Sequence, residues 1–221
     1  GGRGMRVVEK EKDIERMFTL ATNEAEKAFN NPDVFIERFV REPRHIEFQI
    51  LADKHGHVVH LGERECSVQR KHQKLLEESP SPALDAKLRK KMGEAAIKIA
   101  KSVNYYSAGT VEFLLDEDNS FSFMEMNTRV QVEHPVTEMI TGVDIVLEQI
   151  RVASGERLGW TQDEIEFNGH ALECRIAAED PTNFMPCPGP INQWHPGPEL
   201  LFRSLRDHRL RHHAGRPLKT V

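Results

Sequence analysis

The stretch GTVEFLLDEDNSFSFMEMNTRVQVE, residues 109–133, decides the fold expected of this chain. Two runs rich in β-branched and aromatic residues, 109–115 and 121–126, flank an acidic turn, which is typical of a β-hairpin. A hairpin centred between Asp118 and Asn119 would pair Glu112 with Glu125, with their Cβ atoms about 5 Å apart. Two carboxylates that close repel each other unless a proton or a cation lies between them. The pair therefore predicts a cation site.

Polar residues recur at every second position after this pair. If the backbone stays extended, their side chains form one row on a single face of the strand. The row consists of Glu125, Asn127, Arg129, Gln131 and Glu133. Oxygen ligands from Glu112, Glu125 and Asn127 suit Mg²⁺ or Mn²⁺, Arg129 could hold a small oxyanion with two hydrogen bonds, and Glu133 could act as a base. The alternative is an ordinary solvated sheet face that carries charges of both signs.

Beyond this segment, the composition is that of a globular protein. The 221 residues are 38% hydrophobic and 29% charged, with a net charge of -5, which excludes disordered and collagen-like chains. No apolar run approaches the roughly 18 residues of a membrane-spanning helix, and no signal-peptide pattern opens the chain. Cys66, Cys174 and Cys187 form no CxxC pair, so we expect neither a disulfide framework nor a zinc site, and we expect a cytoplasmic protein.

Two kinds of periodicity alternate along the chain and predict an α+β fold. Apolar residues at helical spacing predict helices over residues 13–29, 83–103 and 142–154. Strict alternation of apolar and polar residues predicts a half-buried strand over 44–52, which a turn at 54–57 connects to a strand over 58–61. A late strand is expected over 169–177, with Ala171, Glu173 and Arg175 on one side.

Two other stretches are candidates for phosphate binding. Gly1, Gly2 and Gly4 could let backbone N–H groups approach oxyanions closely, and a simple flexible turn explains the same residues equally well. Residues 69–74, QRKHQK, could clamp a polyphosphate, and a solvated loop is the alternative. No Gly-Lys-Ser/Thr follows the glycines, so this is not a Walker-type P-loop.

The two ends of the chain are unusual. Residues 203–221 carry six Lys or Arg and one acidic residue, a net +5, against 24 basic and 34 acidic residues, or -10, in the remainder. No aromatic residues interleave these charges as a stacking surface for nucleic acid requires, so an irregular terminus is favoured and nucleic acid is not an expected partner. The chain opens in a glycine run without an initiator methionine, so we expect a piece of a longer protein.

Several stretches resemble biotin carboxylase, the ATP-grasp component of biotin-dependent carboxylases. They are GGRGMRVV (1–8), RHIEFQ (44–49), ERECSVQRKHQKLLEE (63–78), AGTVEF (108–113) and MEMNTRVQVEHPVTEMITG (124–142), and GHALECRIAAED (169–180) extends the match. The block around residues 125–138 is the most specific, and the resemblance reaches from residue 1 to about residue 189.

The resemblance implies an ATP-grasp fold in four parts. Residues 1–40 would be part of the lid domain, 41–168 the core with the metal and bicarbonate sites, 169–202 the start of the C-terminal domain and 203–221 an irregular basic tail. The family's N-terminal domain and normal C-terminal end would be missing, which would fit a truncation or a reading-frame change. We therefore expect the 221-residue chain by itself to be inactive and only marginally folded.

The same resemblance implies a role for individual residues. Glu112, Glu125 and Asn127 match the metal ligands, Glu133 matches the base, Arg129, Gln131 and Val132 match the bicarbonate pocket, and Arg175 matches the arginine that steadies the biotin enolate. The positions that match the ATP site are Gly1, Gly2, Gly4, Met5, Glu37, Phe39, Val40, His45, Gln69, His72 and Lys74. Arg38-Phe39-Val40 differs from the family's usual Lys-Tyr-Leu, which is tolerable because this stretch mainly offers backbone groups to the adenine.

The implied activity is ATP-dependent carboxylation of biotin by bicarbonate through carboxyphosphate, most like bacterial acetyl-CoA carboxylase in fatty acid biosynthesis. The implied partners are a biotin carboxyl carrier protein or domain, a carboxyltransferase component and a second copy in a homodimer, and no membrane. The acyl acceptor of the parent carboxylase binds another component, so it is not readable from these residues. Two alternatives stay open: an ATP-grasp ligase of the carbamoyl-phosphate synthetase type, and a non-catalytic module that binds nucleic acid or a partner through its basic tail.

Overall fold

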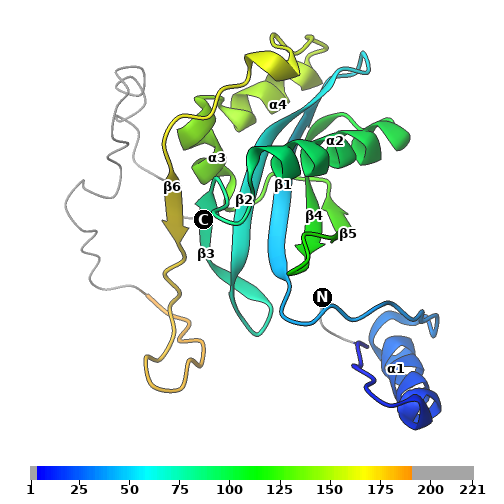
Figure 1. The fold of residues 1–221 in the computed structure, drawn as a ribbon. Helices are drawn as coiled ribbons and strands as arrows, with labels where there is room; N and C mark the ends of the chain where they lie inside the picture. The colour runs from blue at the N-terminus through cyan, green and yellow to red at the C-terminus, as the bar shows by residue number, and fades with distance from the viewer. Residues whose placement is uncertain (1–3, 191–221) are drawn as a thin grey trace. The chain divides into compact units, whose positions relative to one another are not determined.

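The computed structural model describes residues 4–190 and divides the chain into two compact units, one ending at Glu42 and the other beginning at Pro43 (Figure 1). Gly1 and Gly2, the segment 191–202 and the basic tail 203–221 lie outside the described residues. Within the described part, no helix is both long enough and apolar enough to span a membrane.

The first unit is built around one amphipathic helix. A 3₁₀ turn, η1 (Glu11–Asp13), leads into α1 (Ile14–Phe29), which confirms the helix that apolar spacing predicts here. Asn30 ends α1 in the left-handed conformation, with φ 55°. Among the described residues of this unit, the buried apolar side chains are Ala21, Ala25 and Val40. The first unit therefore has a thin core.

An antiparallel sheet of six strands forms the centre of the second unit (Figure 1). The strands are β1 (Arg44–Ala52), β2 (Val58–Arg70), β3 (Gln73–Ser79), β4 (Ser107–Leu115), β5 (Phe121–Asn127) and β6 (Ala171–Cys174). Their order is β5-β4-β1-β2-β3-β6, and every neighbouring pair is antiparallel. The unit also contains α2 (Ala86–Ser102), α3 (His134–Thr141), α4 (Ile145–Ala153) and the 3₁₀ turn η2 (Gln162–Glu164). The α+β class is confirmed.

Helices cover both faces of this sheet, with α2 on one side and α3 and α4 on the other (Figure 1). Ile46, Phe48 and Ile50 of β1 pack in the larger core beneath α2, while Leu51 packs in a second core with residues of α4. Strand β1 is therefore buried on both faces from Ile46 onward, and the prediction of a half-buried strand was wrong. Its polar residues are buried because they face a network of charged side chains rather than water.

Strands β4 and β5 form the predicted hairpin, and Glu112 lies directly opposite Glu125 as expected. The turn, however, is centred on Asp118, because residue 115 pairs with 121 and residue 113 with 123. Asn119 occupies the left-handed region at φ 63°, as the last residue of a three-residue hairpin loop often does. The regular register from this turn would place Met124, not Glu125, opposite Glu112.

A β-bulge at Met124 restores the carboxylate pair. The register shifts by one residue between the pair Phe113 and Phe123 and the pair Glu112 and Glu125. In a regular strand Phe123 and Glu125 would point to the same face. The bulge lets Phe123 approach the ring of Phe113 on the α2 side, with ring centroids 6.5 Å apart, while Glu125 turns to the opposite face.

Several element boundaries differ from the predictions. Strand β2 runs on to Arg70 and residues 73–79 form β3, so the basic stretch 69–74 is a tight hairpin rather than a loop, with Lys71 and His72 both at positive φ. Helix α3 was not predicted and follows Glu133 directly. Asp144 caps α4 by accepting a hydrogen bond from the Leu147 N–H, so α4 begins later than expected, and β6 is only four residues long.

Candidate active site

Polar and charged side chains converge on the face of the sheet opposite α2, and Arg64 of β2 lies at their centre. Its guanidinium is fully buried, and all five of its N–H groups donate hydrogen bonds. The acceptors are Glu47 at 2.5 Å, Gln49 at 2.8 Å, Thr137 at 2.9 Å, and Thr110 and Gln131 at 3.2 Å. Burial alone would lower the pKa of Arg64, but the Glu47 carboxylate raises it. Full pairing explains how the sheet holds a buried charge.

Lys74 of β3 stands among three carboxylates. Its Nζ donates to Glu133 Oε1 at 2.7 Å, to Glu112 Oε1 at 3.1 Å and to Glu47 Oε2. An ammonium group has three N–H donors, so this arrangement uses each of them. Burial opposes the charge of Lys74, but Glu47 and the other carboxylates raise its pKa, so Lys74 is a cation at neutral pH.

Glu112 of β4 joins several parts of the network. Its Oε1 accepts hydrogen bonds from Lys74 and, at 2.9 Å each, from Asn127 Nδ2 and Gln131 Nε2. The His45 Nε2 atom lies 2.9 Å from Glu112 Oε2. Burial alone would raise the pKa of Glu112, but His45 and the Lys74 ammonium lower it to about 2. Glu112 is therefore ionised at neutral pH.

The three predicted metal ligands come together beside this network. Glu125 faces Glu112 across the two strands, and Asn127 Nδ2 lies 2.9 Å from Glu112 Oε1 and 3.3 Å from Glu125 Oε1. Rotation of the Asn127 amide would present its oxygen in place of its nitrogen. Two carboxylates and one amide oxygen then form a hard donor set that fits Mg²⁺ or Mn²⁺. Glu125 is exposed, which leaves coordination positions for phosphate oxygens and water.

The polar row after Glu125 does not lie along one strand as expected, because β5 ends at Asn127. Arg129 is exposed, with Nη2 3.4 Å from Asn127 Oδ1, and Val132 is exposed as well. Gln131 is buried, where its amide links Arg64 to Glu112. The chain turns after β5, and the buried Gln131 side chain points back to the sheet. The residues of the predicted row therefore lie close together around a turn, and not along a single strand.

Glu133 lies directly before α3 and is buried. Its Oε1 accepts a hydrogen bond from Lys74 at 2.7 Å, and its Oε2 accepts one from Arg175 Nη2 at 2.8 Å. Arg175 follows β6, and its Nε donates to Glu77 Oε1 of β3 at 2.6 Å. The structure therefore brings Glu133 and Arg175, predicted from distant parts of the sequence, into direct contact. A carboxylate has about four acceptor positions, so Glu133 retains lone pairs that can take a proton.

The residues that match the ATP site divide between the two units. In the second unit, Gln69 Nε2 lies 3.1 Å from His45 Nδ1, and Gln69 pairs with Lys74 across β2 and β3, so these three lie close together. His72 lies at the exposed tip of the same hairpin. In the first unit are Gly4, Met5, Glu37, Phe39 and Val40, of which Val40 is buried and Phe39 exposed.

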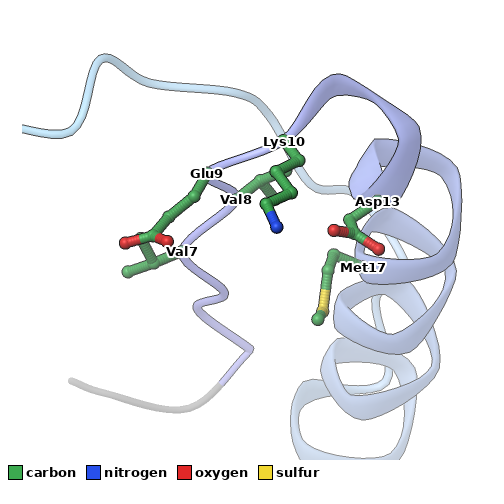
Figure 2. Close-up of a pocket in the computed structure, with 6 residues that line it drawn as sticks. All are labelled: Val7, Val8, Glu9, Lys10, Asp13 and Met17. Atoms are coloured by element: carbon green, nitrogen blue, oxygen red, sulfur yellow. The ribbon is translucent and has the colours of Figure 1, made fainter.

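A shallow pocket of about 400 Å³ lies within the first unit. Figure 2 shows the segment 7–10 facing the start of α1, and the lining residues are Val7, Val8, Glu9, Lys10, Asp13 and Met17. None of the predicted site residues lines this pocket. In the second unit, several of the predicted site residues are instead hydrogen-bonded to one another on the face of the sheet opposite α2.

Sequence reasoning missed several members of the network. Glu47 lies on the polar side of β1, which alternation assigned to solvent, and Arg64 lies in a strand predicted to end at Leu61. Cys66 lies near Glu47, and burial followed by the charge of Glu47 raises the pKa of its thiol. All three cysteines are free, as expected. A usable signal was the sequence Glu63-Arg64-Glu65 directly after an apolar run, because such charges continue a strand only where they are paired.

The chain is similar in sequence and in fold to biotin carboxylases. The biotin carboxylase of Nostoc sp. is 61% identical over 207 residues, which is 92% of this chain and 46% of that protein. A structure of the Campylobacter jejuni biotin carboxylase in complex with a β,γ-ATP ligand has a TM-score of 0.84 and 52% identity over 89% of this chain and 44% of that one.

A further solved relative is the biotin carboxylase domain of the 2-oxoglutarate carboxylase of Hydrogenobacter thermophilus, a dimer in complex with MgADP, ADP and bicarbonate. It has a TM-score of 0.79 and 55% identity over 84% of this chain and 41% of that one. The chain thus spans less than half the length of these relatives. The family model of the carbamoyl-phosphate synthase L chain, ATP binding domain, matches residues 1–161. The chain therefore belongs to this ATP-binding domain family, and within it is homologous to the biotin carboxylases.

Proposed function

We propose that the protein containing this chain carboxylates biotin, using ATP and bicarbonate, through carboxyphosphate. The observation that carries the proposal is the contact of the Glu133 carboxylate with Lys74 and Arg175, next to the paired carboxylates Glu112 and Glu125. These contacts support a base at Glu133, with two cations and a hard-donor pair beside it on the same face of the sheet. High identity to biotin carboxylases supports the same reaction.

In the first step, Glu133 removes the proton of bicarbonate and a carbonate oxygen attacks the γ-phosphorus of ATP. The bond to the β-γ bridging oxygen breaks and ADP leaves, giving carboxyphosphate. We assign bicarbonate binding to Arg129, Gln131 and Val132, because they lie in the turn between the metal ligands and Glu133. A divalent ion held by Glu112, Glu125 and Asn127 would neutralise charge on the transferring phosphoryl group.

In the second step, carboxyphosphate separates into CO₂ and phosphate. The phosphate removes the N1′ proton of biotin, and N1′ then forms the new bond to the CO₂ carbon. Negative charge develops on the ureido oxygen, and Arg175 offsets it with its guanidinium. We assign the nucleotide to His45, Gln69, His72 and Lys74 in the second unit, and to Gly1, Gly2, Gly4, Met5, Glu37, Phe39 and Val40 in the first.

A second candidate is a ligase of the carbamoyl-phosphate synthetase type, because the matching family model bears that name. Such an enzyme also activates bicarbonate with ATP, but it would respond to ammonia rather than to biotin. The identities favour the first proposal, since the relatives at 54–61% identity are biotin carboxylases and subunits of methylcrotonoyl-CoA and 2-oxoglutarate carboxylases.

We further propose that the partners are a biotin carboxyl carrier protein or domain, a carboxyltransferase component and a second copy of the enzyme. The dimer described for the Hydrogenobacter domain supports the last of these. For the parent enzyme we propose an acetyl-CoA carboxylase, and hence fatty acid synthesis, which the sequence resembles most; a related acyl-CoA or pyruvate carboxylase is the alternative. For the location we propose the cytoplasm, which the three free cysteines support.

The test is a chimaera in which this chain replaces the aligned segment of the Nostoc enzyme. We expect ADP release that requires bicarbonate and increases with free biotin, and not with ammonia. Glu133→Gln should lower turnover by at least about 100-fold, as loss of general base catalysis typically does, with ATP affinity changed by less than about 3-fold. Glu94→Gln, at an exposed position of α2, is the matched control. A folded chimaera that ammonia stimulates instead would favour the second candidate.

A further inference from the structure

One buried carboxylate beside the site has no role in the mechanism above. Glu77 of β3 is fully buried, and its Oε1 accepts the hydrogen bond from Arg175 Nε at 2.6 Å. Its Oε2 is buried without a hydrogen-bond partner among the described residues. Burying a carboxylate that is only half satisfied costs free energy. Such a cost is expected where the carboxylate fixes the position of a neighbouring functional side chain.

That neighbour, Arg175, has little other support. It follows the four-residue edge strand β6, and its own N–H donates to the Leu75 carbonyl at 2.9 Å. Its side chain is about one-third exposed, and Nη2 donates to Glu133. In the described part of the chain no hydrogen bond from Nη1 is found. A long side chain at a sheet edge would occupy many rotamers unless both ends of its head group were held.

A second carboxylate faces Glu77 from the neighbouring strand. Glu173 of β6 pairs with Glu77 across the sheet, and Arg175 lies two residues further along the chain, just past the end of β6. Burial and the charge of Glu77 raise the pKa of Glu173 to about 7, while burial raises the pKa of Glu77 and Arg175 opposes that rise. Glu133 and Arg64 also act on Glu173. Of the two facing carboxylates, Glu77 is the one that accepts the hydrogen bond from Arg175 Nε, at 2.6 Å.

We infer that Glu77 is a positioning residue that holds the Arg175 guanidinium with Nη2 on Glu133 and Nη1 directed to substrate. The part of the inference in which Nη1 meets the substrate rests on the proposed function. The contact between Glu77 and Arg175 does not depend on it. Nε and the two Nη atoms of a guanidinium lie in one plane. Anchoring Nε to a buried carboxylate therefore fixes where both remaining arms point.

The first test is a double-mutant cycle in the Nostoc chimaera. Glu77→Ala should lower kcat/KM for biotin by at least about 10-fold and change KM for ATP by less than about 2-fold. In the Arg175→Ala background the same substitution should have no further effect, because Glu77 acts only through Arg175. An equal loss in both backgrounds would show a general structural role and overturn the inference. Glu78→Ala, which removes the neighbouring carboxylate that contacts His170, is the matched control.

The second test needs no activity. In the 221-residue chain labelled with ¹⁵N-arginine, the Nε–H signal of Arg175, identified by its loss in Arg175→Lys, should exchange slowly with solvent. Glu77→Ala should abolish that protection and Glu78→Ala should leave it. An Arg175 Nε–H that exchanges equally fast in all three proteins would overturn the inference. A protected Nε–H together with an inactive but folded chimaera would instead leave the positioning contact standing and refute the proposed function.

Discussion

At the scale of single residues, the site depends on ionic groups that are buried and fully paired. Arg64 donates five hydrogen bonds and Lys74 three, and between them they reach Glu47, Glu112 and Glu133. A buried ion pair adds little net stability relative to apolar residues, but removal of one partner leaves an uncompensated charge. These cations therefore serve to orient the carboxylates, and removing either of them should strongly lower the free energy of unfolding.

Arg64→Met tests this directly. It removes the guanidinium from Glu47 and leaves four other acceptors without their donor, so we expect a loss of about 3–5 kcal/mol in the free energy of unfolding. Arg64→Lys keeps the charge with fewer donors and should lose less. Urea unfolding measures both. Lys90→Met, at an exposed position of α2, is the control, and its free energy of unfolding should stay within about 0.5 kcal/mol of the wild type. If Arg64→Met behaved like this control, the network would not hold the fold.

Glu173 gives a prediction for pH. Its pKa is raised in the folded protein from 4.5 to about 7, mainly because burial disfavours its charge. Between these values the folded chain binds a proton that the unfolded chain has lost, so the contribution of Glu173 to stability is present below pH 4.5 and is lost as pH rises through about 7.

Thermal melts of the wild type and of Glu173→Gln should show this difference, because glutamine cannot ionise. From about pH 5 to about pH 8, the melting temperature of the wild type should fall relative to that of the variant. Glu94→Gln, at an exposed position, should follow the wild type across the same range. A constant difference between wild type and Glu173→Gln would show that Glu173 does not titrate in this window.

At the scale of elements, the bulge in β5 decides which face carries the metal ligands. Strand β5 has to supply Phe121 to the core beneath α2, Phe123 to the edge of the Phe113 ring on the same face, and Glu125 and Asn127 to the site. These four residues alternate at the same parity, so a regular strand would place them all on one face. The extra residue at Met124 shifts the alternation by one, so Phe121 and Phe123 lie on one face and Glu125 and Asn127 on the other.

Two matched deletions in this strand should therefore differ. Deleting Met124 removes the bulge and keeps Glu125 opposite Glu112 and Asn127 on the same face. Deleting Met126 leaves only one of Glu125 and Asn127 on the site face in either register. In folded chimaeras with ATP, Mn²⁺ affinity measured by electron paramagnetic resonance should stay within about 3-fold for the first and fall by at least about 10-fold for the second. Equal losses would refute the role of the bulge.

At the scale of the whole molecule, the two units differ in how much core they have. The sheet unit buries apolar side chains on both of its faces, whereas the described part of the first unit buries Ala21, Ala25 and Val40. Large apolar side chains there stay exposed, and Phe35 is 79% exposed. Local stability follows buried apolar contacts, so the first unit should open far more readily than the second.

Hydrogen exchange followed by mass spectrometry checks this in the 221-residue chain. Peptides from residues 4–42 should exchange at least about 100-fold faster than peptides from β1, β2 and β4, since their amides lack a packed core. Peptides from α2 should be protected nearly as well as these strands. Comparable protection in residues 4–42 and in β1 would show that the first unit is as stable as the sheet.

Local sequence determined the elements whose signal lies within a few residues. The α+β class, helix α1 and the hairpin of β4 and β5 follow from periodicity and turn chemistry, because side-chain alternation and hydrogen-bonding geometry act over short range. The pairing of Glu112 with Glu125 was predicted from a turn centre that differs from the observed one, and it is the bulge at Met124 that produces it. The resemblance located Glu133 and Arg175, but not their contact with each other.

Only the tertiary structure decided which polar residues are buried and what they touch. Alternation predicts that Glu47 faces solvent, and the predicted strand ends before Arg64. The two side chains nevertheless meet in the structure, because β1 pairs with β2 and α3 covers that face of the sheet. Glu77 and Arg175 are far apart in sequence and meet only because β6 adds to the edge of β3. Burial of a charge is favourable only when partners from other strands supply its hydrogen bonds, and that supply is a property of the assembled sheet.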